Sequence, residues 1–307
     1  MESSQTGIFR NVSDKRKERY HIMLKTSVST YSFGRYVESL GIYGVIDKAA
    51  EMGFEGIEFV ESGWSNVELD ELKKIGEYAA EKGLVRASFC VGADFINGSG
   101  GDTAAEVARV KALVDKAAAL GVANMRHDVA SQPRTRKYSI GYDDCLPTMA
   151  DAIREVTKYA EQKGVGTMTE NHGYFSQDAN RVEKLINTVA HPNFGALVDL
   201  GNFMCADEDP WKSVAIMAPY AKHVHAKDFF KKSGMEVNPG PGWFQTRAGD
   251  YLRGTIVGHG EAHICQSIQT LKKNGYDGFV SIEFEGCEDN LLGISWGLEN
   301  LKKFIAM

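Results

Sequence analysis

The sequence has no basic block, no long apolar run and no paired cysteines. Its 41 acidic residues outnumber its 35 lysines and arginines, and the formal net charge of −6 argues against binding to a nucleic-acid backbone. No apolar stretch reaches the roughly 18 residues that a membrane span needs. The five cysteines are scattered without a C-x-x-C motif, which argues against a disulfide framework or a zinc knuckle. We therefore expect a cytoplasmic protein with reduced thiols and no nucleic-acid or membrane partner.

One pattern recurs along the chain: an amphipathic helix ends at a glycine, and a short β-rich run follows at once. A glycine suits this place because a helix often closes on a residue in the left-handed conformation. The pattern occurs in five segments, 49–61, 79–91, 117–129, 160–170 and 271–285. Three further strands are expected within 24–33, 193–202 and 222–229. Eight alternating βα units predict a parallel sheet closed into a TIM-type (β/α)₈ barrel.

Two segments fall outside this repeat. Residues 1–22 are polar and lack the apolar stretch of a signal peptide, so we expect an N-terminal extension before a single barrel domain over 23–307. Residues 229–260 are rich in glycine and proline and form a long insertion after the seventh strand. A loop of this length in a compact domain is usually functional or disordered. Its aromatic and arginine residues favour a functional loop at the catalytic mouth of the barrel.

Polar side chains end four consecutive predicted strands, the fifth to the eighth. Because side chains alternate across a strand, the small apolar residues of AKHVHAKD take one face and its histidines point into the barrel. The strand-end residues are Glu170, Asp199, His225 and Glu283, and Glu285 is a rival for the last position. Three carboxylates and one imidazole would repel and desolvate one another without a cation. The sequence therefore predicts one divalent metal, with Mn²⁺, Mg²⁺, Co²⁺, Fe²⁺ and Zn²⁺ all compatible with these ligands.

The chain resembles the xylose-isomerase-like TIM-barrel superfamily, and most closely its sugar phosphate isomerase/epimerase branch. The matching stretches run in order along nearly the whole chain: GFEGIEFVE, TMTENHG, ALVDLGN, KHVHAKDF and GYDGFVSIEFEG. The resemblance implies that Glu170, Asp199, His225 and Glu283 hold the metal, usually Mn²⁺. It also implies that Glu170 and Glu283 are the catalytic acid/base pair. The chain departs from the ketose 3-epimerases at Asn202, where they have histidine, and in the insertion.

The resemblance implies a metal-dependent sugar isomerase or epimerase that moves a proton through a metal-stabilised enediolate of a ketose or keto-sugar. A lyase or dehydratase is the alternative, either a C-glycoside-cleaving catalytic subunit, which the insertion resembles distantly, or an enzyme like inosose dehydratase. A nuclease is the weakest candidate because its chemistry needs more histidine and aspartate ligands. We expect a small sugar or sugar derivative as substrate and, by analogy with the family, a homo-oligomer.

Further polar residues near the predicted mouth are candidates for substrate contacts. They are His127, His172, Asn202, His223, Lys227, Trp243, Arg247 and Arg253. The register of the fourth strand is ambiguous, so Arg126 or Asp128 could face inward in place of His127. Lys227 and Asp228 could reach a substrate oxygen or pair with each other. Glu58, on the second strand, is interpreted as a buried, hydrogen-bonded carboxylate.

Overall fold

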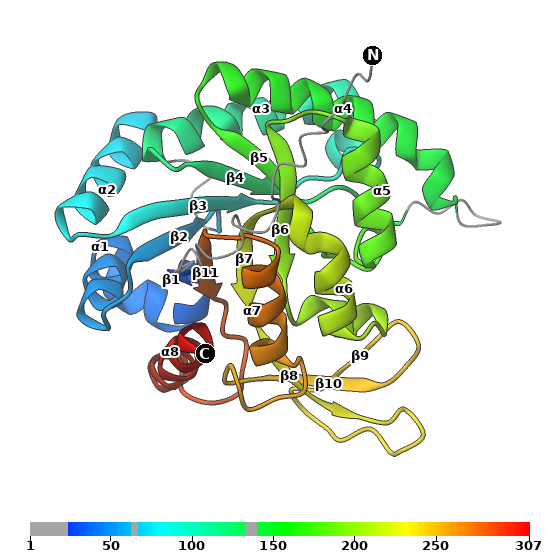
Figure 1. The fold of residues 1–307 in the computed structure, drawn as a ribbon. Helices are drawn as coiled ribbons and strands as arrows, with labels where there is room; N and C mark the ends of the chain where they lie inside the picture. Colours follow the sequence, from blue (N-terminus) through cyan, green and yellow to red (C-terminus); the bar gives the residue numbers. More distant parts are fainter. Residues whose placement is uncertain (1–23, 63–66, 133–139) are drawn as a thin grey trace, which may run out of the picture.

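A computed structural model describes residues 24–62, 67–132 and 140–307, and Figure 1 shows its fold. Eight parallel strands form a closed barrel in the order β1-β11-β7-β6-β5-β4-β3-β2. The predicted (β/α)₈ barrel is confirmed. Its strands are β1 (Lys25–Ser29), β2 (Gly56–Val60), β3 (Val85–Val91), β4 (Asn124–His127), β5 (Gly166–Glu170), β6 (Phe194–Asp199), β7 (Ala221–Ala226) and β11 (Phe279–Ile282). The predicted extension, 1–22, lies outside the described residues.

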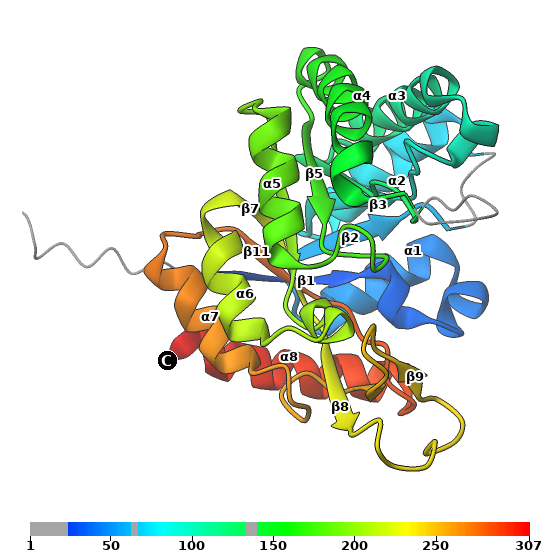
Figure 2. The same ribbon diagram turned by 90° about the vertical axis from the view of Figure 1, so that its right-hand side faces the viewer.

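Helices alternate with the barrel strands and surround them (Figures 1 and 2). They are α1 (Tyr36–Glu51), α2 (Leu69–Glu81), α3 (Thr103–Leu120), α4 (Tyr142–Gln162), α5 (Ala179–Val189), α6 (Pro210–Met217), α7 (Ile264–Lys273) and α8 (Asn290–Ala306). Short 3₁₀ turns lie at η2 (Thr30–Phe33), η3 (Gly98–Gly101), η4 (Asn202–Ala206) and η5 (Ala218–Tyr220). Among the described helices, none combines the length and the apolarity of a bilayer span.

The recurring glycines end helices as the sequence predicts. Each of the five has a positive φ, from 71° at Gly121 to 86° at Gly275. Outside the barrel, the buried faces of the helices and the outward faces of the strands form one large apolar core. Inside the barrel, Cys90, Met168 and Leu197 form a small apolar cluster. Barrel interiors are usually filled by branched apolar residues, so the buried polar residues on other strands are unusual for such an interior.

The insertion after β7 is an ordered antiparallel sheet in the order β8-β10-β9. Its strands are β8 (Asp228–Lys232), β9 (Phe244–Gln245) and β10 (Tyr251–Thr255), and Figure 2 shows β8 and β9 extending beyond the barrel near α8. Asp228 fixes the base of this sheet, because its carboxylate accepts backbone hydrogen bonds from Phe229, Gly258, Gly260 and Ala262. The Asp228 carboxylate is therefore committed to the backbone and does not pair with Lys227.

Candidate metal centre

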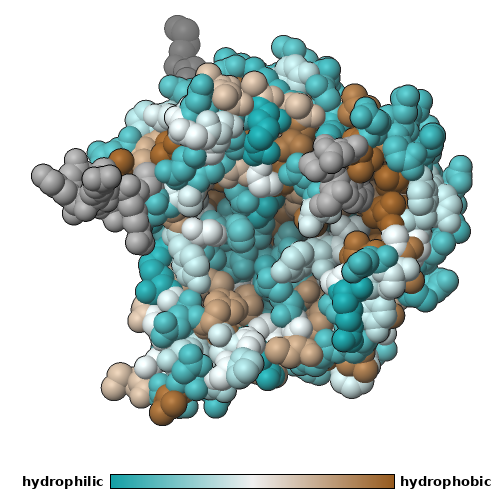
Figure 3. All heavy atoms as spheres, turned by 180° about the vertical axis from the view of Figure 1, so that it is seen from behind, coloured by the Kyte–Doolittle hydropathy of each residue, from teal (hydrophilic) through white to brown (hydrophobic). Residues whose placement is uncertain are grey.

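Four side chains from the carboxyl ends of neighbouring strands meet in one group. Glu170, Asp199 and His225 lie on β5, β6 and β7, and Glu283 directly follows β11. One ligand atom from each lies within 4.8 Å of the ligand atoms of the other three. We call this group the metal cluster. Seen from the side opposite to Figure 1, the surface is hollowed near its middle and hydrophilic residues gather there (Figure 3).

The metal cluster leaves ligand atoms without hydrogen bonds. Asp199 Oδ2, His225 Nδ1 and Glu283 Oε2 are buried and receive no hydrogen bond of normal geometry. The other Asp199 oxygen is held by the backbone N–H groups of Gly201 and Asn202, each at 2.8 Å. Buried polar atoms nearly always have a hydrogen-bond partner, but Asp199 Oδ2 and Glu283 Oε2 have ion-pair contacts with Lys227 and no hydrogen bond. Carboxylate oxygens and an imidazole nitrogen are suitable ligands for a divalent cation, and these residues therefore fit one.

Two cations lie beside the metal cluster. The Arg126 guanidinium is 2.5 Å from Glu170 and 2.8 Å from Asp128, and the Lys227 ammonium is 2.8 Å from Glu283 Oε2 and 3.3 Å from Asp199 Oδ2. Burial alone would raise the pKa of Glu170, but the charge of Arg126 holds it well below its usual range. Burial likewise opposes ionisation of Glu283, while His225 and Lys227 lower its pKa to about 2. The two glutamates therefore stay ionised at neutral pH.

Glu58 on β2 orients the histidine of the metal cluster. Its carboxylate lies 2.9 Å from His225 Nε2 and 3.0 Å from His223 Nε2, and it accepts a hydrogen bond of 2.6 Å from Ser88 Oγ. Glu58 is fully buried, which agrees with the prediction of a buried, hydrogen-bonded carboxylate. A proton on Nε2 leaves the Nδ1 lone pair directed at the metal cluster. Carboxylates commonly fix metal-binding histidines in this way.

The structure corrects the prediction that His127 contacts a substrate. Its ring is buried on the outer side of the barrel wall, with ring centroids 5.5 Å from Phe95 and 5.9 Å from Phe194. Burial lowers the pKa of His127 to about 4, so the ring is neutral. Because side chains alternate along β4, Arg126 takes the inward position and contacts Glu170.

Several other predicted residues do surround the metal cluster. Asn202 donates a hydrogen bond of 2.9 Å to Glu170, and His172 contacts Asp128 at 2.9 Å from the half-exposed rim. His223 lies one pleat below His225 and contacts Ser281 as well as Glu58. Burial would lower the pKa of His172, but the hydrogen bond to Asp128 raises it overall. Whether these residues contact a substrate remains a prediction.

The structure separates Glu283 from its rival. Glu283 belongs to the metal cluster, whereas Glu285 lies one step further out, with Oε2 3.4 Å from Lys227 and Oε1 accepting a 2.9 Å hydrogen bond from Tyr31. Glu283 is therefore the better placed of the two as a ligand.

The predicted residues of the insertion contact protein groups away from the metal cluster. The Arg253 guanidinium lies over the rings of Phe230 and Trp243, at 5.1 and 5.5 Å from their centroids. Arg247 pairs with Asp178 at 3.0 Å, which fixes the insertion to the loop between β5 and α5. These contacts give Trp243, Arg247 and Arg253 a structural role, and their contact with a substrate stays a prediction.

The family model described as a xylose isomerase-like TIM barrel matches residues 46–304. The chain belongs to this family.

Among the similar proteins are a dehydratase, an epimerase and a barrel protein solved with magnesium. An inosose dehydratase of Clostridium perfringens is 25% identical over 171 residues, which are 53% of this chain and 56% of the relative. This chain thus spans about half the length of that curated relative. A D-psicose 3-epimerase from Clostridium cellulolyticum, solved with D-tagatose, has a TM-score of 0.67 at 16% identity and covers 92% of this chain and 94% of its own. A barrel protein from Mycobacterium smegmatis in complex with magnesium has a TM-score of 0.68 at 16% identity, with 93% and 97% covered. The two structural likenesses show the fold alone.

Proposed function

We propose that this protein is a metal-dependent enzyme that moves a proton at the carbon next to a carbonyl group, as a sugar isomerase or epimerase. The observation that carries the proposal is the pairing of Glu170 and Glu283 in one group with unpaired ligand atoms. Their strands, β5 and β11, lie on either side of β6 and β7 in the barrel. Two carboxylates that approach a substrate from different directions can remove a proton and return it.

Glu170, Asp199, His225 through Nδ1, and Glu283 would hold the metal ion. When bound, a divalent ion acts as a Lewis acid that polarises a carbonyl oxygen and stabilises the charge of the deprotonated substrate. Mn²⁺ is the ion that we propose. The magnesium in the structural relative supports a divalent ion but does not select among them.

The surrounding residues prepare the two glutamates for proton transfer. Arg126 and Lys227 keep Glu170 and Glu283 ionised at neutral pH, so neither carboxylate carries a proton before a substrate binds. Asn202 orients Glu170 by its 2.9 Å hydrogen bond, and Glu58 keeps the imidazole of His225 in one orientation. A hydroxyketone such as a ketose or keto-sugar has the acidic carbon and the two neighbouring oxygens that this arrangement suits.

A dehydratase is the second candidate, and the similarity to an inosose dehydratase favours it. In a dehydratase, removal of the same proton is followed by loss of a hydroxide from the next carbon. The products are then water and a dehydrated compound, where an isomerase would form an isomer. The two reactions share the first step, so the same glutamates would serve both. Homo-oligomer formation and a cytoplasmic location stay predictions.

Deuterium exchange from D₂O tests the proposal and separates the two reactions. The Mn²⁺-loaded protein is incubated with a panel of ketoses, keto-sugars and inososes, and the products are followed by NMR and mass spectrometry. Deuterium in an epimer or isomer supports the first candidate, and a dehydrated product supports the second. If the metal-loaded protein exchanges deuterium into none of the hydroxyketones, both candidate reactions are contradicted.

A further inference from the structure

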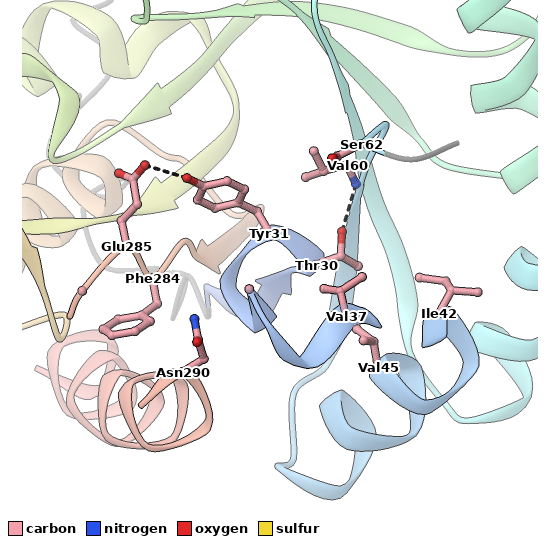
Figure 4. Close-up of a pocket in the computed structure, with 12 residues that line it drawn as sticks. Thr30, Tyr31, Val37, Ile42, Val45, Val60, Ser62, Phe284, Glu285 and Asn290 are labelled. Atoms are coloured by element: carbon pink, nitrogen blue, oxygen red, sulfur yellow. Dashed lines mark hydrogen bonds between the residues drawn. The ribbon is translucent and has the colours of Figure 1, made fainter. Parts of the chain in front are cut away.

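A second recess lies beside the metal cluster, where the ends of β1, β2 and β11 meet α1. It encloses about 490 Å³, and Figure 4 shows its lining. Most of the wall is apolar and consists of Val37, Ile42, Val45, Val60 and Phe284. The polar edge consists of Thr30, Tyr31, Ser62, Glu285 and Asn290. We call this recess the Tyr31 pocket.

The Tyr31 pocket and the metal cluster share a chain of contacts. The Tyr31 hydroxyl donates a 2.9 Å hydrogen bond to Glu285 Oε1, the other oxygen of Glu285 is 3.4 Å from the Lys227 ammonium, and Lys227 is 2.8 Å from Glu283. In this chain of contacts, one side chain, Lys227, lies between Glu285 in the pocket wall and the predicted metal ligand Glu283. Glu285 therefore belongs both to the pocket wall and to the network of contacts that reaches the metal cluster.

The apolar part of the pocket suits an apolar ring better than a ring covered with hydroxyl groups. About 490 Å³ corresponds to roughly sixteen water volumes, a space suited to a ring with substituents. Sugar hydroxyls turned toward Val37, Ile42 and Val60 would lose hydrogen bonds to water without replacement, which is unfavourable. An apolar ring in the same place would gain from leaving water.

We propose that the Tyr31 pocket is a subsite for an apolar, ring-sized group that the substrate carries beside its hydroxyketone part. The substrate class is then a ring-substituted keto-sugar or a glycoside with an apolar aglycone, in preference to a free monosaccharide. The inference rests on the proposed function, because the metal cluster supplies the site for the hydroxyketone. Tyr31 and Glu285 lie between the part of the site that binds the polar end of the substrate and the part that binds its apolar ring.

Two metal-chelating probes that differ only in their tails test this inference. Acetohydroxamate and 3-phenylpropionohydroxamate share a head that mimics a hydroxyketone, and their binding to the Mn²⁺-loaded protein is measured by titration calorimetry. Burial of the phenyl ring should make the second probe bind about 10- to 100-fold more tightly. Val37→Trp fills the pocket from a partly exposed position, 36% exposed, and should remove this difference while acetohydroxamate binds as before.

Val85→Trp is the matched control, because Val85 is 50% exposed at the start of β3, the opposite end of the barrel. It should keep the full preference for the phenyl probe. Val37→Asp, which places a charge in the pocket without filling it, replaces Val37→Trp if that variant does not fold. Equal binding of both probes, or a preference that survives both Val37 variants, overturns the subsite and leaves the metal site standing. Binding of neither probe, or binding that does not depend on Mn²⁺, contradicts the proposed function itself.

Discussion

Glu106 and Asp199 are both buried carboxylates, but their surroundings differ. Glu106 lies in the first turn of α3, and both of its oxygens are hydrogen-bonded: Oε1 accepts from the Asp94 backbone at 3.0 Å and from Arg109, and Oε2 accepts from Ser99 at 2.8 Å and from Arg109. Burial opposes its ionisation, yet these donors lower the pKa of Glu106 to about 2. Asp199 has one oxygen held by the backbone and one without a hydrogen bond.

The difference separates a structural carboxylate from a ligand. Glu106 finds all its donors within twelve residues of chain, so the folded protein satisfies it completely. The metal cluster brings three carboxylates and one imidazole from four strand ends together, and Asp199 Oδ2, His225 Nδ1 and Glu283 Oε2 have no hydrogen bond there. Loss of Glu106 should therefore reduce stability without affecting metal binding. Loss of a cluster residue should weaken metal binding without reducing the stability of the metal-free protein.

The largest effect is expected for the two glutamates of the metal cluster. Glu170→Gln and Glu283→Gln should each lower turnover roughly 100- to 10,000-fold at saturating Mn²⁺, because an amide cannot accept the proton. Turnover is measured on the substrate that the deuterium panel identifies, with bound metal quantified in each sample. Glu155→Gln is the control, since Glu155 is an exposed residue of α4 that pairs with Lys111. Wild-type turnover in both cluster variants would rule out the paired-glutamate mechanism.

A smaller effect is expected for Glu58, which touches the metal cluster only through His225. Glu58→Gln should weaken Mn²⁺ binding roughly 10- to 100-fold, because the amide no longer fixes the imidazole tautomer. Calorimetric titration measures the affinity, and the circular dichroism spectrum verifies folding. An unchanged affinity in a folded variant would mean that Glu58 has only a structural role.

Glu106→Gln should lower the free energy of unfolding by about 1–3 kcal/mol, because Arg109, Ser99 and the Asp94 N–H lose a charged acceptor. Urea unfolding in metal-free buffer measures this, and Mn²⁺ affinity should stay at the wild-type value. Asp199→Asn is the counterpart, and its metal-free form should be at least as stable as the wild type. A destabilised Asp199→Asn beside an unaffected Glu106→Gln would invert the comparison.

The smallest effect is expected in how the difference in unfolding free energy between wild type and Glu106→Gln depends on pH. The folded pKa of Glu106, about 2, lies below the ordinary glutamate pKa of 4.5, so its stabilising contribution is complete above pH 4.5 and is lost as the pH falls toward 2. The gap in unfolding free energy between wild type and Glu106→Gln should therefore narrow between pH 5 and pH 3 in urea titrations. A gap that widens on acidification would contradict the assigned pKa direction.

Local patterns predicted the barrel and the arrangement of most of the metal cluster. The strand of His225 alternates small apolar with polar residues, so its inward face could be identified, and positive-φ glycines marked the helix ends. The end of β4 gave no such contrast, because Arg126, His127 and Asp128 are all polar, and the sequence left open which of them points inward.

Contacts that depend on barrel closure were beyond local patterns. Glu58 and His225 are 167 residues apart, and only the closed register brings them to 2.9 Å. The antiparallel sheet of the insertion could not be predicted either, because β9 has only two residues and a strand this short leaves no periodic pattern. The partners of Arg247 and Arg253 follow from that sheet and were equally hidden.

The most direct test of the central claim is a calorimetric Mn²⁺ titration of wild type and Asp199→Asn, with metal content verified by elemental analysis. Asparagine keeps the size of Asp199 and the oxygen that the Gly201 and Asn202 backbone groups hold, so the fold is preserved while the ligand charge is lost. We expect about one Mn²⁺ per wild-type chain and at least roughly 100-fold weaker binding in the variant. Equal binding by the two proteins, or no binding by the wild type, would contradict a metal centre at these strand ends.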